Sequence, residues 1–223
     1  MELRVVVWNV HGLRAGVSAP AEALGRHEPD VVLLNEVGWS GWRLRRLARA
    51  LDAGAASGLR LLRWGITNAV LVRPPWRLLR ARTIGLPRRA GPRRGLVAAL
   101  IGRSGYRLTA ASMHLGLSGP ERLAHARDLT DRILPGLRAP VLLGGDLNEP
   151  PEGRAVSWLA DRLWDGFAAA GEGPGETFPA TDPRARIDYL FLPGDVQVAG
   201  AFVDHEAAEA SDHLPLVADL ELP

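Results

Sequence analysis

The sequence predicts a mixed α/β fold, and two observations support this prediction. Apolar segments of strand length, rich in valine and leucine, occur in runs, and each ends in a polar cluster, as buried strands do. About four segments with helical spacing lie between these runs, so the order is neither a strict alternation of strand and helix nor all strand. No linker, internal repeat or low-complexity segment interrupts the 223 residues. We therefore expect a single domain over residues 1–223.

The N-terminal half is predicted to contain two helices. Residues 18–27 have a proline near the start, where a missing N–H is tolerated. Residues 42–51 place Leu44 and Leu47 on one face and arginines off that face, which is typical of an amphipathic helix. The strands expected in this half are 3–8, 31–35, 59–63, 69–73, 96–101 and 107–113. A loop with turn residues, 88–94, divides this set.

The C-terminal half contains the best helix candidate, 120–137, whose leucines and isoleucine form one stripe. A further helix is expected over 151–162, followed by a loop rich in glycine and proline over 171–183. The expected strands are 141–143, 186–192, 196–203 and 214–222. His125 lies outside every motif, and we expect it on the surface of a helix or loop.

The composition excludes several classes of protein. The chain has no cysteine, which excludes a disulfide scaffold, a thiolate metal site and a thiol nucleophile. The longest charge-free stretch, 108–120, is too short and too polar to span a bilayer. The N-terminus begins like a strand, without the basic and apolar regions of a secretory signal. We therefore expect a cytoplasmic protein without a membrane anchor, and a monomer for which no protein partner is inferred.

Charge is unevenly distributed along the chain. All 27 basic residues are arginine, against 25 acidic residues, so the formal net charge is only +2. Residues 1–111 hold 19 arginines and 6 acids, a net charge of +13, whereas residues 112–223 hold 8 arginines and 19 acids, a net charge of −11. Between Asp52 and Glu121 lie 12 arginines and no acid. This separation suggests that the fold brings basic and acidic faces together around one site.

Polar clusters occur where the predicted strands stop. They are Asn9, Asn35 with Glu36, His114, Asp146 with Asn148, Asp188, and Asp212 with His213. Open sheets place ligand sites at such edges, so we expect these carboxylates, amides and imidazoles to converge on one rim.

The ligand types in these clusters indicate a chemistry. Oxygen donors without cysteine suit Mg²⁺, with Mn²⁺ as a substitute, rather than zinc. A carboxylate-held Mg²⁺ binds phosphate oxygens, and a histidine beside an aspartate has a fixed tautomer and a raised basicity. Together these groups predict metal-assisted hydrolysis of a phosphate ester by in-line attack of water.

Six motifs resemble those of the endonuclease/exonuclease/phosphatase superfamily, the DNase I-like proteins. They are Trp8-Asn9-Val10-His11-Gly12, Asn35-Glu36, Met113-His114-Leu115, Gly145-Asp146-Leu147-Asn148, Arg186-Ile187-Asp188-Tyr189 and Ser211-Asp212-His213-Leu214-Pro215. Their order and spacing match from residue 8 to residue 215. The resemblance implies a four-layered α/β sandwich, with two mixed β-sheets packed face to face, helices outside and the site at one edge. It also implies Mg²⁺-dependent cleavage of phosphoesters.

The resemblance also implies roles for individual residues. Glu36 would be the principal metal ligand, with Asp212 near the metal. His213 would act as general base or phosphate binder, oriented by Asp188. Glu36 follows Asn35, where the family usually has glutamine, and an asparagine there can still form local hydrogen bonds.

Four further residues complete the implied catalytic set. Asp146 would take part in proton transfer, to the leaving group or from the water, and Asn9 and Asn148 would position the phosphate and the attacking water. His114 would stabilise the developing charge or protonate the leaving oxygen. Endonucleases that act on abasic sites usually have tyrosine at the position of His114, which argues against a dedicated enzyme of that kind.

Arginines and aromatic rings are the candidate substrate contacts. The arginines are Arg88, Arg89, Arg93 and Arg94, which could follow a polyanion. Trp39 lies in the loop after Glu36, and Phe178 lies in a loop before Asp188, so either ring could stack on a base. Trp42, Trp64 and Trp76 are further candidates for stacking.

The leading hypothesis is a Mg²⁺-dependent phosphodiesterase that acts on nucleic acid, with DNA favoured as the substrate. One alternative is a phosphoesterase of the same superfamily that acts on a small molecule or a lipid, such as an inositol phosphate or sphingomyelin. Another alternative is a binding module that keeps the fold without turnover. The filled acid, base and metal positions speak against this last alternative.

Overall fold

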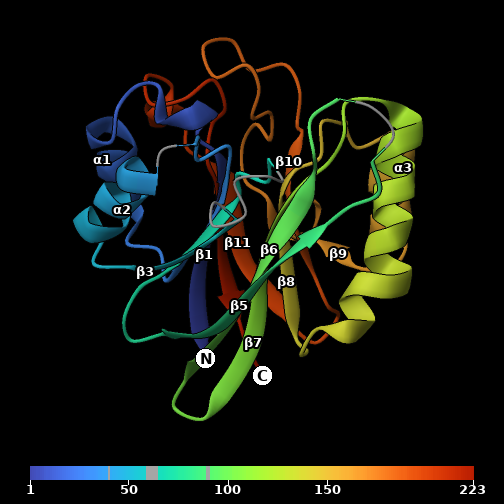
Figure 1. Ribbon diagram of the computed structural model, residues 1–223, viewed down its shortest axis with the longest axis horizontal. Helices are drawn as coiled ribbons and strands as arrows, with labels where there is room; N and C mark the ends of the chain where they lie inside the picture. Colours follow the sequence, from blue (N-terminus) through green and yellow to red (C-terminus); the bar gives the residue numbers. More distant parts are fainter. Residues whose placement is uncertain (40, 59–64, 89–90) are drawn as a thin grey trace.

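The computed structural model consists of two mixed six-stranded sheets that pack face to face, with helices on the outside (Figure 1). It describes residues 1–39, 41–58, 65–88 and 91–223. The predicted strand over 59–63 lies outside the described residues, as do Trp64 and Arg89. The architecture confirms the predicted four-layered α/β sandwich.

The first sheet has the strand order β11-β12-β1-β2-β4-β3. Its strands are Gln197–Val203 (β11), Leu216–Glu221 (β12), Glu2–Asn9 (β1), Val31–Asn35 (β2), Ala69–Val72 (β4) and Gly54–Ser57 (β3). β1 runs parallel to β2 and antiparallel to β12. The register of the parallel pair sets Asn9 beside Asn35, so both side chains lie at the same end of this sheet.

The second sheet has the strand order β5-β6-β7-β8-β10-β9. Its strands are Arg77–Gly85 (β5), Gly95–Arg103 (β6), Tyr106–His114 (β7), Val141–Asp146 (β8), Asp188–Leu192 (β10) and Trp164–Asp165 (β9). β7 and β8 are parallel, whereas β8 and β10 are antiparallel. This register aligns His114, Asp146 and Asp188 in one row across three neighbouring strands.

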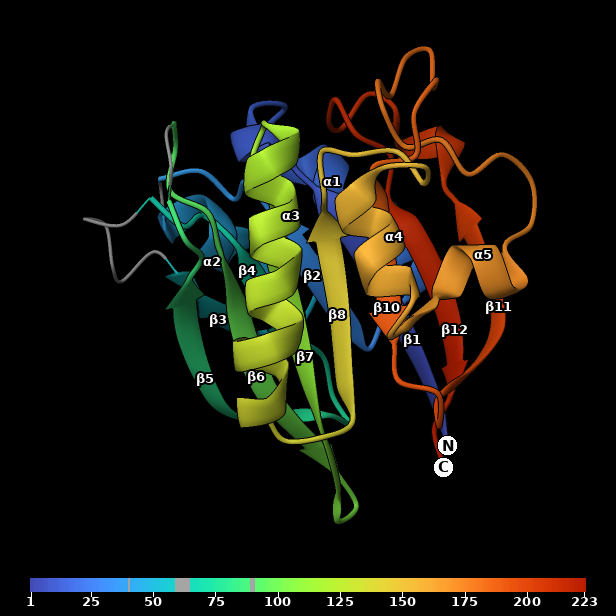
Figure 2. The ribbon, with the colours of Figure 1, turned by 90° about the vertical axis from the view of Figure 1, so that its right-hand side faces the viewer.

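Helices cover the outer faces of both sheets. Ser18–His27 (α1) and Gly41–Ala50 (α2) pack on the first sheet, while Gly119–Asp128 (α3) and Arg154–Ala160 (α4) pack on the second (Figure 2). α3 continues as a π-helical turn, Leu129–Ile133 (η3), and a 3₁₀ turn, Leu134–Gly136 (η4), so the predicted long helix is a chain of three helical types. The short helix Gly166–Ala170 (α5) contacts β10 and β11.

Alternating side chains of the buried strands explain the layering. Val5 and Val7 of β1 belong to the core between the two sheets, whereas Val6 and Trp8 belong to the core beneath α1 and α2. Successive side chains of a strand point to opposite faces, so a strand covered on both faces is apolar at every position. This is why the strand residues Val31–Asn35 form an almost continuous apolar run.

Two glycines allow the sheets to approach closely near the end of β8. A Cβ added to Gly144 would lie 2.7 Å from a methyl carbon of Leu33 and 2.8 Å from one of Val7, both in the opposite sheet. Gly145 has a φ of 147°, and a Cβ there would lie 1.8 Å from the carbonyl oxygen of Met113. The Gly-Gly pair before Asp146 is therefore a packing requirement that brings this carboxylate up to the first sheet.

The structure corrects two expectations about single residues. His125 is buried beneath the surface of α3, where Nε2 donates to the carbonyl of Pro87 at 2.6 Å and Nδ1 accepts from the backbone N–H of Gly116 at 3.2 Å. Trp76 is buried in the core between the sheets and is unavailable for stacking on a base. Local spacing does not predict the burial of either side chain, because the residues that cover them come from other segments of the chain.

Among the residues that the structure describes, no helix has both the length and the apolar character needed to cross a membrane.

Candidate active site

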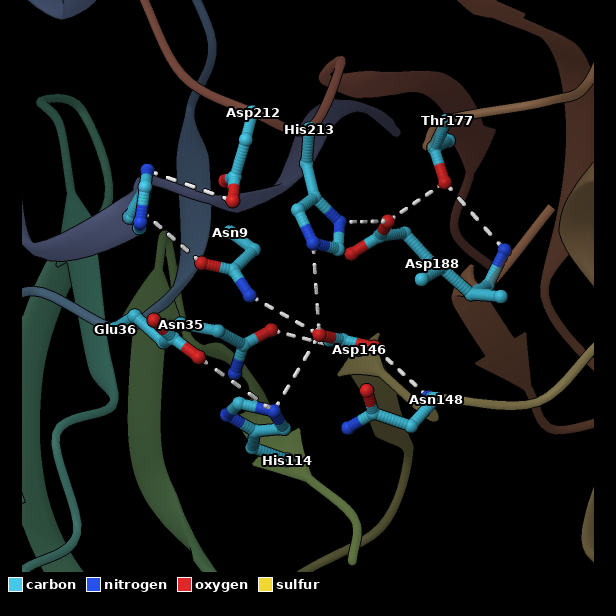
Figure 3. A network of polar contacts seen from close by, with 12 residues as sticks. Asn9, Asn35, Glu36, His114, Asp146, Asn148, Thr177, Asp188, Asp212 and His213 are labelled. Carbon is cyan, nitrogen blue, oxygen red and sulfur yellow. Dashed lines mark hydrogen bonds and ion pairs between the residues drawn. The ribbon is translucent and has the colours of Figure 1, made fainter. Parts of the chain in front are cut away.

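The polar residues predicted from the strand ends meet at one edge of the sandwich (Figure 3). β1, β2, β7 and β8 finish at this edge, while β10 and the segment before β12 start there. The residues brought together are Asn9, Asn35, Glu36, His114, Asp146, Asn148, Asp188, Asp212 and His213. Each sheet supplies part of the set, so the cluster lies across the interface between the two sheets.

Asp146 is the centre of this network. Its Oδ2 accepts from Nδ2 of Asn9 at 3.0 Å and lies 3.3 Å from Nε2 of His114 and 3.9 Å from Nε2 of His213. Its Oδ1 accepts from the backbone N–H of Asn148 at 2.8 Å. Burial alone would raise the pKa of the Asp146 carboxyl, but His114, His213 and this backbone N–H hold it well below its ordinary value. Asp146 is therefore a buried carboxylate that stays ionised.

His213 is oriented by a buried carboxylate. Its Nδ1 donates to Oδ2 of Asp188 at 2.8 Å, and the hydroxyl of Thr177 donates to the same oxygen at 2.6 Å. The ring of Phe178 packs against the imidazole with the two centroids 4.8 Å apart. These contacts fix the ring, so its Nε2 faces Asp146 and the centre of the site.

The charges of this pair depend on each other. Burial would lower the pKa of His213, but the facing carboxylates of Asp188, Asp146 and Asp212 raise it to about 9. Complete burial raises the pKa of Asp188, while the contacts from His213 and Thr177 act in the opposite direction. The carboxylates around His213 therefore favour its protonated form, which presents an N–H donor to the site.

The second imidazole, His114, is equally enclosed. Its Nε2 lies 3.3 Å from Oδ2 of Asp146 and 4.0 Å from Oε1 of Glu36. Its Nδ1 contacts Nη1 of Arg94 at 2.7 Å. The motif predicts His114 at the site, whereas the contact with Arg94 differs from the expectation that this arginine binds substrate directly.

Glu36 and Asp212, the predicted metal ligands, lie at the open rim of the cluster. Their side chains are 39% and 40% exposed, in contrast to the buried Asp146 and Asp188. Asp212 Oδ2 lies 3.4 Å from Nδ1 of His11, which belongs to the first of the six motifs. Carboxylate oxygens without any thiolate are the donors that Mg²⁺ and Mn²⁺ prefer, so the chemistry of these residues fits a divalent cation.

A second set of potential ligand atoms lies deeper in the site. One oxygen of Asp146, one of Asp188 and a ring nitrogen of His213 all lie within 4.8 Å of one another. The Asp188 oxygen that bonds the imidazole is already shared by two donors. We therefore regard the exposed carboxylates as the better candidates for an ion that must also reach a substrate.

Several residues in or next to the site have a left-handed backbone conformation. His11, Leu13, Glu36 and Asn148 have positive φ values of 44°, 52°, 51° and 52°. A non-glycine residue in this left-handed region is uncommon and persists where surrounding contacts determine it. The carbonyl of Glu36 accepts from the N–H of Gly12, and the N–H of Val37 donates to the carbonyl of Thr67, so these bonds hold the strained turn that directs the Glu36 carboxylate toward the site.

Asn35 forms hydrogen bonds between the two sheets, whereas the sequence predicted only local hydrogen bonds. It is fully buried, its Oδ1 accepts from the backbone N–H of Asp146 at 2.8 Å, and its Nδ2 donates to the carbonyl of Met113 at 2.7 Å. Both partners belong to the opposite sheet. Asn35 therefore links the two sheets directly beneath the site and fixes the position of Asp146, rather than forming local hydrogen bonds.

A groove of about 560 Å³ opens beside Glu36. Its lining includes Arg14, Trp39, Arg43, Arg93 and Arg94. The ring of Trp39 is 64% exposed. Arg88 instead lines a neighbouring groove of about 510 Å³ with Ile66 and Leu86, and Arg93 and Arg94 line both. The structure thus places Trp39 and two of the predicted arginines next to the carboxylate cluster, and it adds Arg14 and Arg43.

This fold and this cluster of carboxylates, imidazoles and amides define a hydrolase of phosphoric esters. Residues 6–213 match the model of the Endonuclease/Exonuclease/phosphatase family, so the chain belongs to this family, as its motifs predicted. Enzymes of this family are typically metal-dependent. The comparison with curated proteins found no match.

Several solved structures share the whole fold. An endonuclease/exonuclease/phosphatase from Bacteroides vulgatus superposes with a TM-score of 0.86 at 19% identity, and all of both chains is covered. The mannosyl-6-phosphatase of Bacteroides thetaiotaomicron gives 0.84 at 17% identity, covering 99% of this chain and 100% of its own. The catalytic domain of human Nocturnin with a bound sulfate anion gives 0.77 at 20% identity, covering 100% and 95%. At these identities the likeness concerns the fold alone.

Proposed function

We propose that this protein is a Mg²⁺-dependent phosphodiesterase that cleaves nucleic acid, with DNA as the favoured substrate. The observation that carries the proposal is the groove lined by arginines and by the exposed ring of Trp39, which opens next to Glu36. Arginines neutralise backbone phosphates and an exposed tryptophan offers a face for a base. Such a groove beside a phosphoesterase site suits a polymer with phosphates on either side of the scissile bond.

In this proposal Glu36 and Asp212 hold the divalent cation, with Mn²⁺ able to replace Mg²⁺. When bound, the cation supplies charge neutralisation for the phosphoryl oxygens. Asn9 and Asn148 position the phosphate and the attacking water through amide groups that add no charge of their own. The side-chain amide of Asn9 and the backbone N–H of Asn148 both donate to Asp146, which keeps the two residues beside the same carboxylate.

Proton transfer is assigned to Asp146 and the two imidazoles. Asp146 stays ionised, so it accepts a proton from the attacking water rather than protonating the leaving group. As the new P–O bond forms, the bond to the leaving oxygen breaks in line with it. His213 and His114 direct Nε2 toward Asp146 Oδ2, where each is positioned to donate to an oxygen of the substrate.

Nicking of supercoiled plasmid tests the proposal. Purified protein with Mg²⁺ is expected to produce open circles, and a chelator is expected to stop the reaction. Glu36→Gln, which keeps the shape of the side chain and removes its charge, is expected to lose at least about 100-fold in rate while keeping the wild-type circular dichroism spectrum. Absence of cleavage for every DNA and RNA form tested, with metal present, would contradict a nuclease function.

A small phosphoester is the second candidate substrate, because a structure that shares the entire fold is described as a mannosyl-6-phosphatase. The same catalytic cluster would then act on a sugar phosphate or an inositol phosphate. A panel of phosphomonoesters, together with sphingomyelin, separates the two candidates. Turnover of one panel member that exceeds plasmid nicking in kcat/KM by more than about tenfold would favour the small substrate.

A further inference from the structure

Arg94 occupies an unusual place for an arginine. It is half-buried beside His114, and its Nη1 lies 2.7 Å from Nδ1 of that imidazole. A guanidinium carries five N–H donors and no acceptor. The ring nitrogen that faces Arg94 must therefore be the acceptor, which means that Nδ1 of His114 carries no proton.

The proton of the imidazole is then located on the other nitrogen. Nε2 of His114 lies 3.3 Å from Oδ2 of Asp146 and 4.0 Å from Oε1 of Glu36, so both of its near neighbours are acceptors. We propose that Arg94 is a positioning residue that holds His114 in its Nε2–H tautomer and thereby aims an N–H donor at the phosphoryl site. The arginine thus acts through His114, not through direct contact with the substrate.

The fold fixes Arg94 in this place. β6 begins at Gly95, whose register partner on β7 is His114, so Arg94 lies one residue beyond the end of that pairing. The carbonyl of Arg94 accepts from the N–H of Leu86 at 3.0 Å, and the carbonyl of Gly95 accepts from Nδ2 of Asn68 at 3.0 Å. The backbone carbonyls of Arg94 and Gly95 are therefore fixed by hydrogen bonds that do not involve the catalytic side chains.

The charge environment is consistent with this role. Burial lowers the pKa of Arg94, while the carboxylates of Asp146, Glu36 and Glu121 act to raise it. Arginine nevertheless stays protonated in proteins, so it remains a donor at any pH at which the enzyme is folded. A neutral amide carries an acceptor oxygen as well as donors, so it would not fix the tautomer in the same way.

The same arrangement recurs on the other side of the site. Nη1 of Arg14 lies 2.8 Å from Nε2 of His11, and Nδ1 of His11 lies 3.4 Å from Oδ2 of Asp212. There too an arginine faces one ring nitrogen while the other nitrogen faces an acidic residue of the cluster. This pair is exposed, whereas His114 is buried and Arg94 half-buried, so the more enclosed pair is the one that the proposal concerns.

Under the proposed function, which this inference deepens, the Nε2–H of His114 would donate to a phosphoryl or leaving oxygen when substrate binds. The opposite tautomer would place a lone pair toward the substrate oxygen and toward the carboxylates. A fixed donor of this kind lowers the barrier because no reorientation is needed during the reaction.

Nuclear magnetic resonance of the imidazole nitrogens tests the tautomer directly. The full chain, labelled with ¹⁵N-histidine and saturated with Mg²⁺, is expected to show His114 with a protonated Nε2 and an unprotonated Nδ1. Arg94→Met is expected to lose this preference, and Arg94→Lys, which keeps a donor-only cation, is expected to retain most of it. Arg107→Met is the matched control, because Arg107 is exposed at the far end of β7. A protonated Nδ1 in the wild-type protein would overturn the proposal.

Steady-state kinetics distinguish a positioning role of Arg94 from a role in substrate binding. They are measured on the phosphoester that the enzyme turns over. Arg94→Met is expected to lower kcat by roughly 10- to 100-fold with little change in KM. If Arg94→Met raised KM alone and left the ring signals of His114 unchanged, Arg94 would be a substrate ligand and the proposal would be wrong. The ring signals need no substrate, so the tautomer is measurable even if the proposed nuclease activity fails.

Discussion

One carboxylate oxygen, Oδ2 of Asp146, faces donors from three different segments of the chain. Asn9 approaches from β1, His114 from β7, and His213 from the segment before β12. Three donors around a buried oxygen stabilise its ionised form and leave little freedom for the donors themselves. A phosphate bound beside this oxygen would meet donors that are already oriented.

Thr177 is expected to matter through Asp188 and His213. Thr177→Val removes a hydroxyl that donates to the buried Oδ2 of Asp188 at 2.6 Å. A hydrogen bond to a charged group is worth about 1.5–3 kcal/mol, so we expect kcat to fall by about 10- to 100-fold. Thr177→Ser keeps the hydroxyl and is expected to retain activity close to wild type. Equal losses in both variants would argue against this role of the hydroxyl.

Trp39 is expected to contribute to binding rather than to the chemical step. Trp39→Ala should weaken binding of single-stranded DNA by about 1–3 kcal/mol, the usual contribution of one stacked base. The matched control is Trp164→Ala, because Trp164 is similarly exposed, at 60%, but belongs to β9, outside the groove. Fluorescence anisotropy of a labelled oligonucleotide in the presence of a chelator measures both variants.

Strand ends allowed the sequence to predict which polar residues meet, since the ends of neighbouring strands share one edge of a sheet. The partners of those residues were harder to predict. Thr177 reaches Asp188 from a loop, Arg94 reaches His114 across a strand pair, and Asn35 reaches into the opposite sheet. Each of these contacts depends on tertiary packing, for which local spacing carries no signal.

At the scale of elements, Asp204 ties α1 to the turn that follows β11. Its Oδ2 accepts from Arg26 at 2.9 Å and from His27 at 2.8 Å, and its Oδ1 accepts from the N–H of Glu206 at 2.9 Å. Burial would raise the pKa of Asp204, but these hydrogen bonds outweigh it and hold the pKa below its ordinary value. The carboxylate therefore contributes stability in its ionised form.

Asp204→Asn is expected to destabilise the fold in a pH-dependent way. Because the folded pKa is depressed, the contribution is present above the ordinary pKa of about 3.9 and is lost as the pH falls through the folded value. We expect a loss of about 1–3 kcal/mol in the free energy of unfolding at pH 7, shrinking toward zero in strong acid. Glu206→Gln, which removes the charge of an exposed neighbour, is the control in chemical denaturation. A pH-independent difference would contradict the assignment.

Elements with strong periodicity were predictable, and those without it were not. The helix over 18–27 and the strand over 31–35 lie where the sequence predicted them. β5, Arg77–Gly85, was missed because it is an edge strand whose side chains are mostly exposed and often arginine, which removes the apolar signal. Charged side chains on an edge strand prevent it from pairing with other chains, and this is why β5 lacks the apolar pattern of a buried strand.

At the scale of the whole molecule, the charge separation predicts a salt-dependent interaction with polyanions. Binding of duplex DNA in the presence of a chelator should weaken with a log–log slope of about −0.9 per phosphate contacted. Arg43→Gln, which alters the groove, is expected to reduce the magnitude of that slope by about 1. Arg107→Gln, on the exposed far end of β7, is expected to leave the slope unchanged. A slope near zero for the wild-type protein would exclude a phosphate-tracking groove.

Because the site lies between the two sheets, ligand binding there is expected to be coupled to the stability of the fold. Asn9 and Asn35 extend from the first sheet to Asp146 on the second, so a phosphate bound beside Asp146 would contact both layers. Glu36 and Asp212 are brought together by folding, so a cation held by them would bind the folded chain in preference to the unfolded one. Mg²⁺ should therefore raise the midpoint of thermal unfolding as its concentration passes the dissociation constant, and Asp212→Asn should reduce the shift. If Mg²⁺ has this effect, a shortage of metal would lower the stability of the folded protein as well as its activity.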